Sequence, residues 1–142
     1  MPSTFHTSRR IEFADTDMAG IAHFSSFLRF VEEAEHAFLR SLGLSVIQPD
    51  ESGKFSWPRV SVKCDYRGPA RFEEVLDIAL QVSRIGTSSI TYQFQMHCQK
   101  RHVANAEMTA VYCRFDLNQP PHPVPIPKSI LDLLSPFCLV AE

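Results

Sequence analysis

A single amphipathic segment, residues 24–42, constrains the fold more than any other feature, because it is the only long helix pattern in the sequence. Its apolar residues recur at steps of three and four, which places them on one face of a helix. They are Phe24, Phe27, Leu28, Val31, Ala34, Phe38 and Leu42. Ser25 and Ser26 are candidates to cap the start of this helix, and Gly43 suits the position just after its end.

Five other segments alternate apolar and polar residues, which is the pattern of half-buried β-strands. They cover residues 5–13, 59–66, 76–83, 90–98 and about 103–115. Residues 44–56 carry turn-forming residues and are expected to form a loop. Five prolines predict an extended stretch over residues 117–127, and Pro127 suits the first turn of a short C-terminal helix.

These elements predict one α+β domain over residues 1–142. A five-stranded antiparallel sheet has one apolar face to cover, and the long helix is the only element large enough to cover it. The expected fold is therefore a sheet wrapped around one long helix, followed by a short C-terminal helix. One helix cannot also protect both edges of the sheet, so pairing between two copies of the chain is expected.

Charge and hydropathy narrow the expected partners and location. The net charge is −2 and no basic run exceeds two residues, which gives no reason to expect nucleic acid binding. The first twenty residues lack the apolar segment of a secretory signal, and no apolar run approaches the roughly 20 residues of a membrane span. We therefore expect a cytoplasmic protein. Cys64 and Cys98 occupy apolar strand positions and are expected to be reduced.

The junction between the first strand and the long helix concentrates the reactive side chains. Asp15, Asp17, Gly20 and His23 fall within nine residues there. A carboxylate in this place lies next to the unpaired backbone N–H groups of a helix start, as an acyl-transfer site requires. The alternative interpretation of either aspartate is a turn residue that caps backbone N–H groups. We expect Asp15 to stabilise the turn.

Residues 10–21 match the pattern aromatic-x-Asp-x-Asp-x-x-Gly-(Ile/Val). With supporting stretches at residues 66–72, 85–88 and 126–130, this sequence resembles the 4-hydroxybenzoyl-CoA thioesterase-like family, in particular its small bacterial acyl-CoA thioesterases. The resemblance covers nearly the whole chain in the same order. It implies a hotdog fold, a homodimer or homotetramer with active sites between subunits, and neither metal nor cofactor. The implied substrate is an acyl-CoA or acyl-carrier-protein thioester.

The resemblance also implies roles for individual residues. Asp17 corresponds to the catalytic aspartate, acting as nucleophile or as general base. The backbone N–H at about Phe24 would polarise the thioester carbonyl. Phe24, Gly20 and His23 are thus the predicted substrate-binding residues. His23 stands where relatives often have a tyrosine or another aromatic residue, so its role is open between substrate contact and structure.

Several alternatives carry less support. Glu32 and His36 have the spacing of two metal ligands, but no third ligand is evident. Some hotdog thioesterases use a glutamate inside the helix, for which Glu32, Glu33 and Glu35 are available, but the His-Gly-Gly turn that accompanies it is absent. No Gly-x-Ser-x-Gly motif supports a serine triad. A hotdog dehydratase and a non-catalytic acyl-binding hotdog module are the remaining functional alternatives.

The phosphates of CoA have no assigned site in the sequence. Some relatives hold them with a basic cluster beside a hairpin that corresponds here to residues 86–89, which are Gly-Thr-Ser-Ser. Five basic residues are candidates by charge alone: Arg67, Arg71, Arg84, Lys100 and Arg101.

Overall fold

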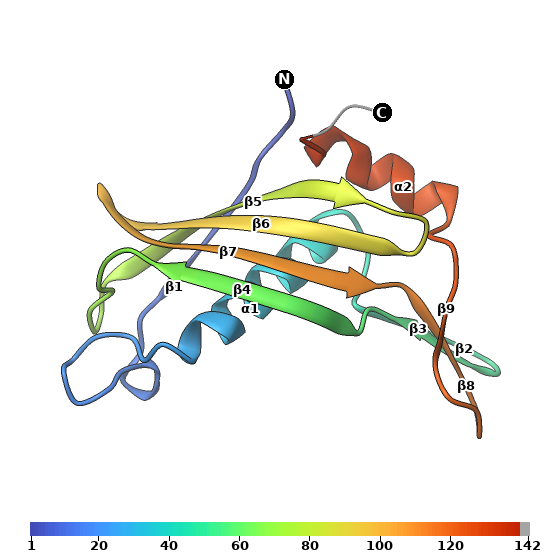
Figure 1. Ribbon diagram of the computed structural model, residues 1–142, viewed down its shortest axis with the longest axis horizontal. Helices are drawn as coiled ribbons and strands as arrows, with labels where there is room; N and C mark the ends of the chain where they lie inside the picture. Colours follow the sequence, from blue (N-terminus) through green and yellow to red (C-terminus); the bar gives the residue numbers. More distant parts are fainter. Residues whose placement is uncertain (140–142) are drawn as a thin grey trace.

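The computed structural model describes residues 1–139, and it has one long helix lying in the concave face of a five-stranded antiparallel sheet (Figure 1). The helix is α1 (Ser26–Ser41), and the strand order is β1-β5-β6-β7-β4. The strands are β1 (Phe5–Arg10), β4 (Arg59–Tyr66), β5 (Val75–Ile85), β6 (Ser89–Cys98) and β7 (Arg101–Val111). A short C-terminal helix, α2 (Lys128–Leu134), is followed by the 3-10 turn η2 (Ser135–Phe137). The predicted α+β architecture is confirmed.

The core lies between α1 and the inner face of the sheet. This is expected, because the apolar residues recur every three or four positions in the helix and every second position in the strands. The helix buries Phe27, Phe30, Val31, Ala34, Phe38 and Leu39. On the sheet side, β7 contributes the small side chains of Ala104, Ala106 and Ala110, which allow the helix to pack closely. Gly43 ends the helix with φ +77, a conformation that favours glycine. The expectation for the helix start was wrong, since neither Ser25 nor Ser26 caps it with its side chain.

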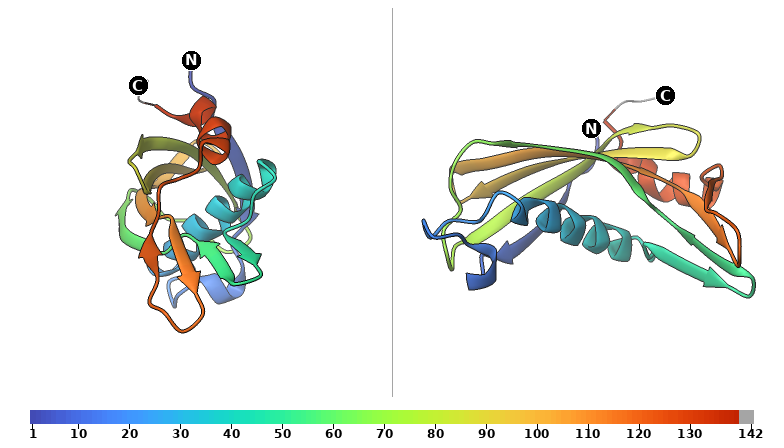
Figure 2. Two further views of the ribbon diagram at one scale, coloured as in Figure 1. Left: turned by 90° about the vertical axis from the view of Figure 1, so that its right-hand side faces the viewer. Right: turned by 60° about the horizontal axis from the view of Figure 1, so that its bottom comes forward.

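Residues 44–56 are not the loop that Pro49 and the turn-forming residues around it suggested. They contain β2 (Ile47–Asp50) and β3 (Gly53–Ser56), and the last predicted strand continues past a break as β8 (Cys113–Asp116). With β9 (His122–Pro123) these strands form a second sheet in the order β2-β3-β8-β9, beyond the C-terminal end of α1 (Figure 2). Pro49 is tolerated because β2 is an edge strand of that sheet.

Long-range contacts hold the second sheet together. Phe55 stacks on Tyr112 with ring centroids 5.3 Å apart, and the Arg114 guanidinium donates to both carboxylate oxygens of Asp50. Residues 44–56 are thus ordered by distant parts of the chain. Arg114 and Asp50, for example, are 64 positions apart in the sequence. Contacts between residues so far apart in the chain produce no periodic pattern of apolar residues from which these strands could be predicted.

Glu35 differs from the other two glutamates of α1, because it lies inside the core. Its side chain is fully buried between the helix and the sheet, where it forms an ion pair with Arg59 of β4. Its Oε2 atom and the hydroxyl of the buried Tyr92 have no hydrogen-bond partner among the described residues. Burial, the largest effect, raises the pKa of Glu35, and the nearby Arg59 opposes this increase only in part.

Replacing Glu35 by Gln is expected to change how stability depends on pH. Because its pKa in the folded protein lies above the usual 4.5, the stability associated with protonated Glu35 is complete below pH 4.5 and is lost as pH rises through the raised pKa. The neutral amide has no such loss. The stability of Glu35→Gln relative to the wild type should therefore increase as pH rises above 4.5 in denaturant titrations. Glu107→Gln, at an exposed position on β7, is the control, and parallel pH profiles for wild type and Glu35→Gln would contradict the prediction.

The remaining expectations concern cysteines and membranes. Cys64, Cys98 and Cys113 are free thiols. Cys98 is buried and Cys64 is half-buried, in agreement with reduced core residues. No helix among residues 1–139 is long and apolar enough to cross a membrane.

Candidate active site

The acidic turn forms a closed loop between β1 and α1. After β1, residues Phe13–Asp15 make the 3-10 turn η1. Thr16 and Ala22 then face each other in an antiparallel bridge, inside which the Asp17 N–H donates to the Ile21 carbonyl at 2.9 Å. Gly20 takes φ +80, which only glycine adopts without strain, and this conformation closes the loop. Asp17 is thereby held at the beginning of a tight turn.

The Asp17 side chain is exposed and faces an open hollow of about 620 Å³. Its Oδ1 atom accepts the Ala19 N–H at 2.8 Å, while Oδ2 accepts no hydrogen bond from the described residues. The hollow is lined by Phe13, Thr16, Asp17, Met18, Gly20 and Phe72. The rings of Phe13 and Phe72 meet edge to face across it, with centroids 6.0 Å apart. A carboxylate oxygen free to react thus lies beside apolar and aromatic surface.

Asp15, two residues earlier, is in the opposite environment. Its carboxylate is buried and forms ion pairs with Arg9 of β1 and Arg29 of α1, and it accepts the Glu12 N–H at 2.7 Å. Burial alone raises the pKa of this carboxyl, but the Glu12 N–H and the two guanidinium groups outweigh it and lower the pKa below its usual 3.8. Asp15 therefore joins strand, turn and helix, as predicted for the residue that stabilises the turn.

The main chain of Asp15 also positions the start of the helix. Its carbonyl accepts the His23 N–H at 2.7 Å and the Ser26 hydroxyl at 2.9 Å. Ser26, expected as a cap, is therefore buried and bonded back to the acidic turn. The first turn of α1 is fixed relative to Asp17 through this one residue.

Phe24 lies between His23 and Ser26, the two residues that bond to the Asp15 carbonyl, and it is 66% exposed. Its backbone N–H makes no hydrogen bond within residues 1–139, and it lies one residue before Ser25, the N-cap residue of α1. Its carbonyl accepts the hydroxyl of Tyr66, from the end of β4, at 2.8 Å. The Tyr66 ring packs edge to face on Phe27 at 5.3 Å. Sequence reading missed Tyr66 as part of the site, although it begins one of the supporting stretches of the family resemblance.

His23 stacks on the Phe24 ring with centroids 4.5 Å apart. Its Nδ1 atom accepts the Ser25 N–H at 3.2 Å and lies 2.8 Å from the Ser25 hydroxyl. The neutral imidazole therefore carries its proton on Nε2. His23 and Phe24 follow Asp17 in the same strand–helix junction, but neither of them lines the hollow beside Asp17.

Residues 70–72 form the other wall of the site. The Ala22 N–H donates to the Ala70 carbonyl at 2.7 Å, and the Phe72 N–H donates to the Gly20 carbonyl at 3.3 Å. Ile21 and Arg71 face each other in an antiparallel bridge. The loop that carries Asp17 is thus supported by the segment that links β4 to β5.

Two of the three helix glutamates considered as alternative catalytic residues are engaged elsewhere. Glu33 accepts the Arg9 guanidinium at 2.9 Å, and Glu35 is buried against Arg59. None of the three lines the hollow beside Asp17. The geometry therefore favours the carboxylate of the turn over a carboxylate of the helix.

Comparisons with known proteins agree with this geometry. Residues 11–134 match the thioesterase-like superfamily. A putative esterase of Aquifex aeolicus is 29% identical over 126 residues, which are 89% of this chain and 94% of that protein. A 1,4-dihydroxy-2-naphthoyl-CoA hydrolase of Synechocystis sp. is 30% identical over 111 residues, 78% of this chain and 75% of that protein. The crystal structure of a 1,4-dihydroxy-2-naphthoyl-CoA thioesterase from Synechocystis superimposes with a TM-score of 0.79 at 23% identity, covering 94% of this chain and 96% of that one.

Proposed function

Because this chain belongs to the thioesterase-like superfamily and has its hotdog fold, we propose that it hydrolyses the thioester of an acyl-CoA to a carboxylic acid and free CoA. One observation carries the proposal. Asp17 presents a free carboxylate oxygen to an apolar hollow, and the unbonded Phe24 N–H lies at the adjoining helix start. Thioester hydrolysis needs these two groups, a nucleophile or base and a donor for the developing negative charge.

The chemistry has two forms that use the same residues. In one, the Asp17 carboxylate attacks the thioester carbon, the C–S bond breaks to release CoA thiolate, and water hydrolyses the resulting mixed anhydride. In the other, Asp17 takes a proton from a water molecule that attacks the carbonyl, the C–S bond breaks, and the proton passes to the departing CoA thiolate. In both, the Phe24 N–H donates to the carbonyl oxygen as it becomes negative, assisted by the positive end of the helix dipole.

Gly20 and His23 support this arrangement. Gly20 allows the left-handed turn that directs Asp17 toward the hollow. His23 places a ring N–H on Nε2 beside the helix start, where it is a candidate donor to the substrate or to a water molecule. We therefore assign both to substrate binding, with Asp17 alone as the catalytic side chain.

Release of free thiol from a panel of thioesters tests the proposal. The panel contains short and long aliphatic acyl-CoAs, aromatic acyl-CoAs and the matching acyl-carrier-protein thioesters. 1,4-Dihydroxy-2-naphthoyl-CoA belongs in it because two relatives are named for that substrate. Thiol release supports the hydrolase. A hotdog dehydratase changes the acyl chain and releases no thiol, and an acyl-binding module binds the thioesters without turnover, so either result would overturn the proposal.

Tyr66→Phe is expected to lower kcat about fivefold with little change in KM. The substitution keeps the ring contact with Phe27 but removes the hydroxyl that holds the Phe24 main chain. We therefore treat Tyr66 as a positioning residue for the donor at the helix start. Steady-state kinetics measure the effect. Tyr112→Phe, which removes a hydroxyl bonded to the distant Gln48, is the matched control, and equal kcat values for all three proteins would refute the role of Tyr66.

We further propose that the protein is a homodimer or homotetramer. β4 is an edge strand of the main sheet, and its apolar residues Val60, Val62 and Tyr66 remain 61%, 45% and 47% exposed. Phe24 and Leu28 of the adjoining helix start are exposed as well. An unpaired edge beside an apolar surface favours a second copy of the chain. Sedimentation analysis should give a multiple of 16.1 kDa for the wild type and a smaller species for Val62→Asp.

A further inference from the structure

We propose that Arg67 and Arg71 bind the phosphate groups at the nucleotide end of CoA and so select CoA thioesters over thioesters that lack this end. The proposal rests on the proposed thioesterase function and adds a substrate-binding site to it. It follows from where these two arginines lie and from the absence of an ion pair to either guanidinium among the described residues, although the charge of Arg71 also helps to lower the pKa of Glu74.

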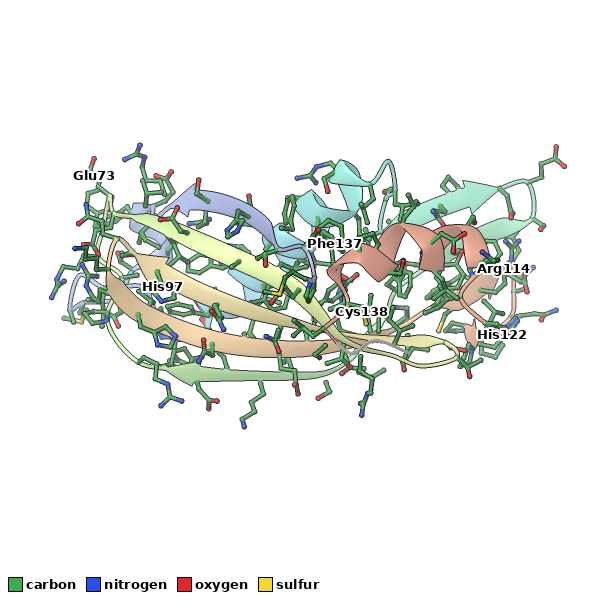
Figure 3. All side chains as sticks on the ribbon, turned by 90° about the horizontal axis from the view of Figure 1, so that it is seen from above. Glu73, His97, Arg114, His122, Phe137 and Cys138 are labelled. Carbon is green, nitrogen blue, oxygen red and sulfur yellow. The ribbon has the colours of Figure 1, made fainter. Side chains whose placement is uncertain are left out.

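Both arginines belong to the segment that links β4 to β5, and residues 70–72 of this segment form one wall of the candidate active site. Arg71 faces Ile21 of the acidic loop in an antiparallel bridge, and its neighbour Phe72 lines the hollow beside Asp17. Arg67 follows Tyr66, whose hydroxyl bonds to the Phe24 carbonyl. Glu73, two residues after Arg71, marks this end of the molecule, opposite Arg114 and the second sheet (Figure 3). A thioester bound at Asp17 would thus have these two side chains close to the rim of its site.

The two guanidinium groups are exposed and form no ion pair within residues 1–139. The other arginines at this end are engaged. Arg9 and Arg29 bind Asp15, and Arg10 donates to the Glu73 carbonyl at 3.2 Å. Phosphate oxygens are strong acceptors that match the planar guanidinium fork, so unpaired arginines are suited to bind them.

Arg101, another basic candidate, acts as a clamp for the same segment. It donates to both carboxylate oxygens of Glu74, at 2.9 and 2.6 Å, and to the Pro69 carbonyl at 2.5 Å. The hydrogen bonds from Arg101 lower the pKa of Glu74 to about 2, so this carboxylate stays ionised and neutralises Arg101. Arg101 therefore holds residues 69–74 in place, and the positive charge offered to a ligand comes from Arg67 and Arg71.

The same chemistry favours CoA over an acidic carrier protein as the ligand. Two guanidinium groups suffice for phosphate oxygens, whereas an acidic protein surface is matched by a broad basic surface. The chain as a whole carries a net charge of −2, which opposes the approach of a second acidic protein.

The test compares the double variant Arg67→Ala/Arg71→Ala with the wild type on three thioesters of one acyl group. These are the acyl-CoA, the acyl-dephospho-CoA, which lacks the 3′-phosphate, and the acyl-N-acetylcysteamine, which lacks the whole nucleotide end. The variant should lose about tenfold or more in kcat/KM on acyl-CoA, mainly through KM. It should match the wild type on the N-acetylcysteamine thioester. The result with dephospho-CoA assigns the contact to the 3′-phosphate or to the diphosphate. Arg40→Ala, at an exposed and unpaired arginine near the end of α1, is the control.

Other outcomes would overturn the proposal. An equal loss on the N-acetylcysteamine thioester would show that the arginines support the loop and bind no phosphate. A CoA-specific loss in Arg84→Ala in place of the double variant would move the site to the far end of β5. A loss confined to acyl-carrier-protein substrates would make the ligand a protein. If the wild type hydrolyses none of the thioesters, calorimetry with CoA still decides the matter, because the proposal requires that the double variant bind CoA more weakly than the wild type.

Discussion

Asp17→Asn is expected to lower kcat for thioester hydrolysis by about 10²–10⁴ while leaving the free energy of unfolding within about 0.5 kcal/mol of the wild type. The amide can neither attack the thioester nor take a proton from water. It keeps an oxygen that can accept the Ala19 N–H, so the turn retains its hydrogen bond. The side chain is exposed and forms no ion pair among the described residues, which leaves little stability to lose.

Initial rates of thiol release and denaturant unfolding measure the two parts of this prediction. Asp77→Asn is the matched control, because it makes the same chemical change at an exposed position on β5. Its activity and stability should equal those of the wild type. A folded Asp17→Asn protein with wild-type turnover would remove Asp17 from the mechanism and with it the proposed assignment of the site.

Asp15→Asn is expected to act in the opposite way, with a loss of about 2–3 kcal/mol in the free energy of unfolding. The carboxylate is 3% exposed and faces two guanidinium groups, which would be left beside a neutral amide. The loss should stay below that of a fully buried ion pair, because the Arg29 side chain is 47% exposed to water. Denaturant unfolding at neutral pH measures the difference.

The pH dependence gives a second signature for Asp15. Its pKa in the folded protein is lowered below the usual 3.8, so the ionised carboxylate stabilises the fold above pH 3.8, and this contribution is lost as pH falls through the lowered pKa. The stability difference between wild type and Asp15→Asn should therefore be constant near neutral pH and shrink in acid. Asp17→Asn, the same substitution two positions away, is the control. An Asp15→Asn protein as stable as the wild type would mean that the two ion pairs do not hold the turn.

Asp17 and Asp15 differ in how much of their environment could be predicted from the sequence. The turn that contains Asp17 and Gly20 and leads into the helix could be predicted, because its conformation depends on residues that are adjacent in the sequence. The partners of Asp15 could not be read in this way. Arg9 and Arg29 lie on different elements, and nothing in the local pattern relates them to one buried carboxylate. Tyr66 was missed for the same reason, since 42 positions separate it from Phe24.

The fold shows the same division. Alternation and helical periodicity predicted the five main strands and the long helix, since burial on one face leaves a periodic trace in the sequence. The second sheet left no such trace, because β2 and β3 are four-residue strands ordered by β8 and by contacts such as Arg114 with Asp50. Glu35 is a further case, since a charged residue in a helix is read as exposed unless its distant partner, here Arg59, is known.

The sequence by itself thus determined the order of elements, the single long helix under the sheet and the turn that carries Asp17, because each depends on residues close together in the chain. Only the tertiary structure decided which aspartate is buried and which is free, that the Phe24 N–H is left unbonded, and that Arg67 and Arg71 form no ion pair among the described residues. The physical reason is that exposure, ion pairing and hydrogen bonding are set by contacts between elements, and these depend on how β1, α1 and the end of β4 meet in space.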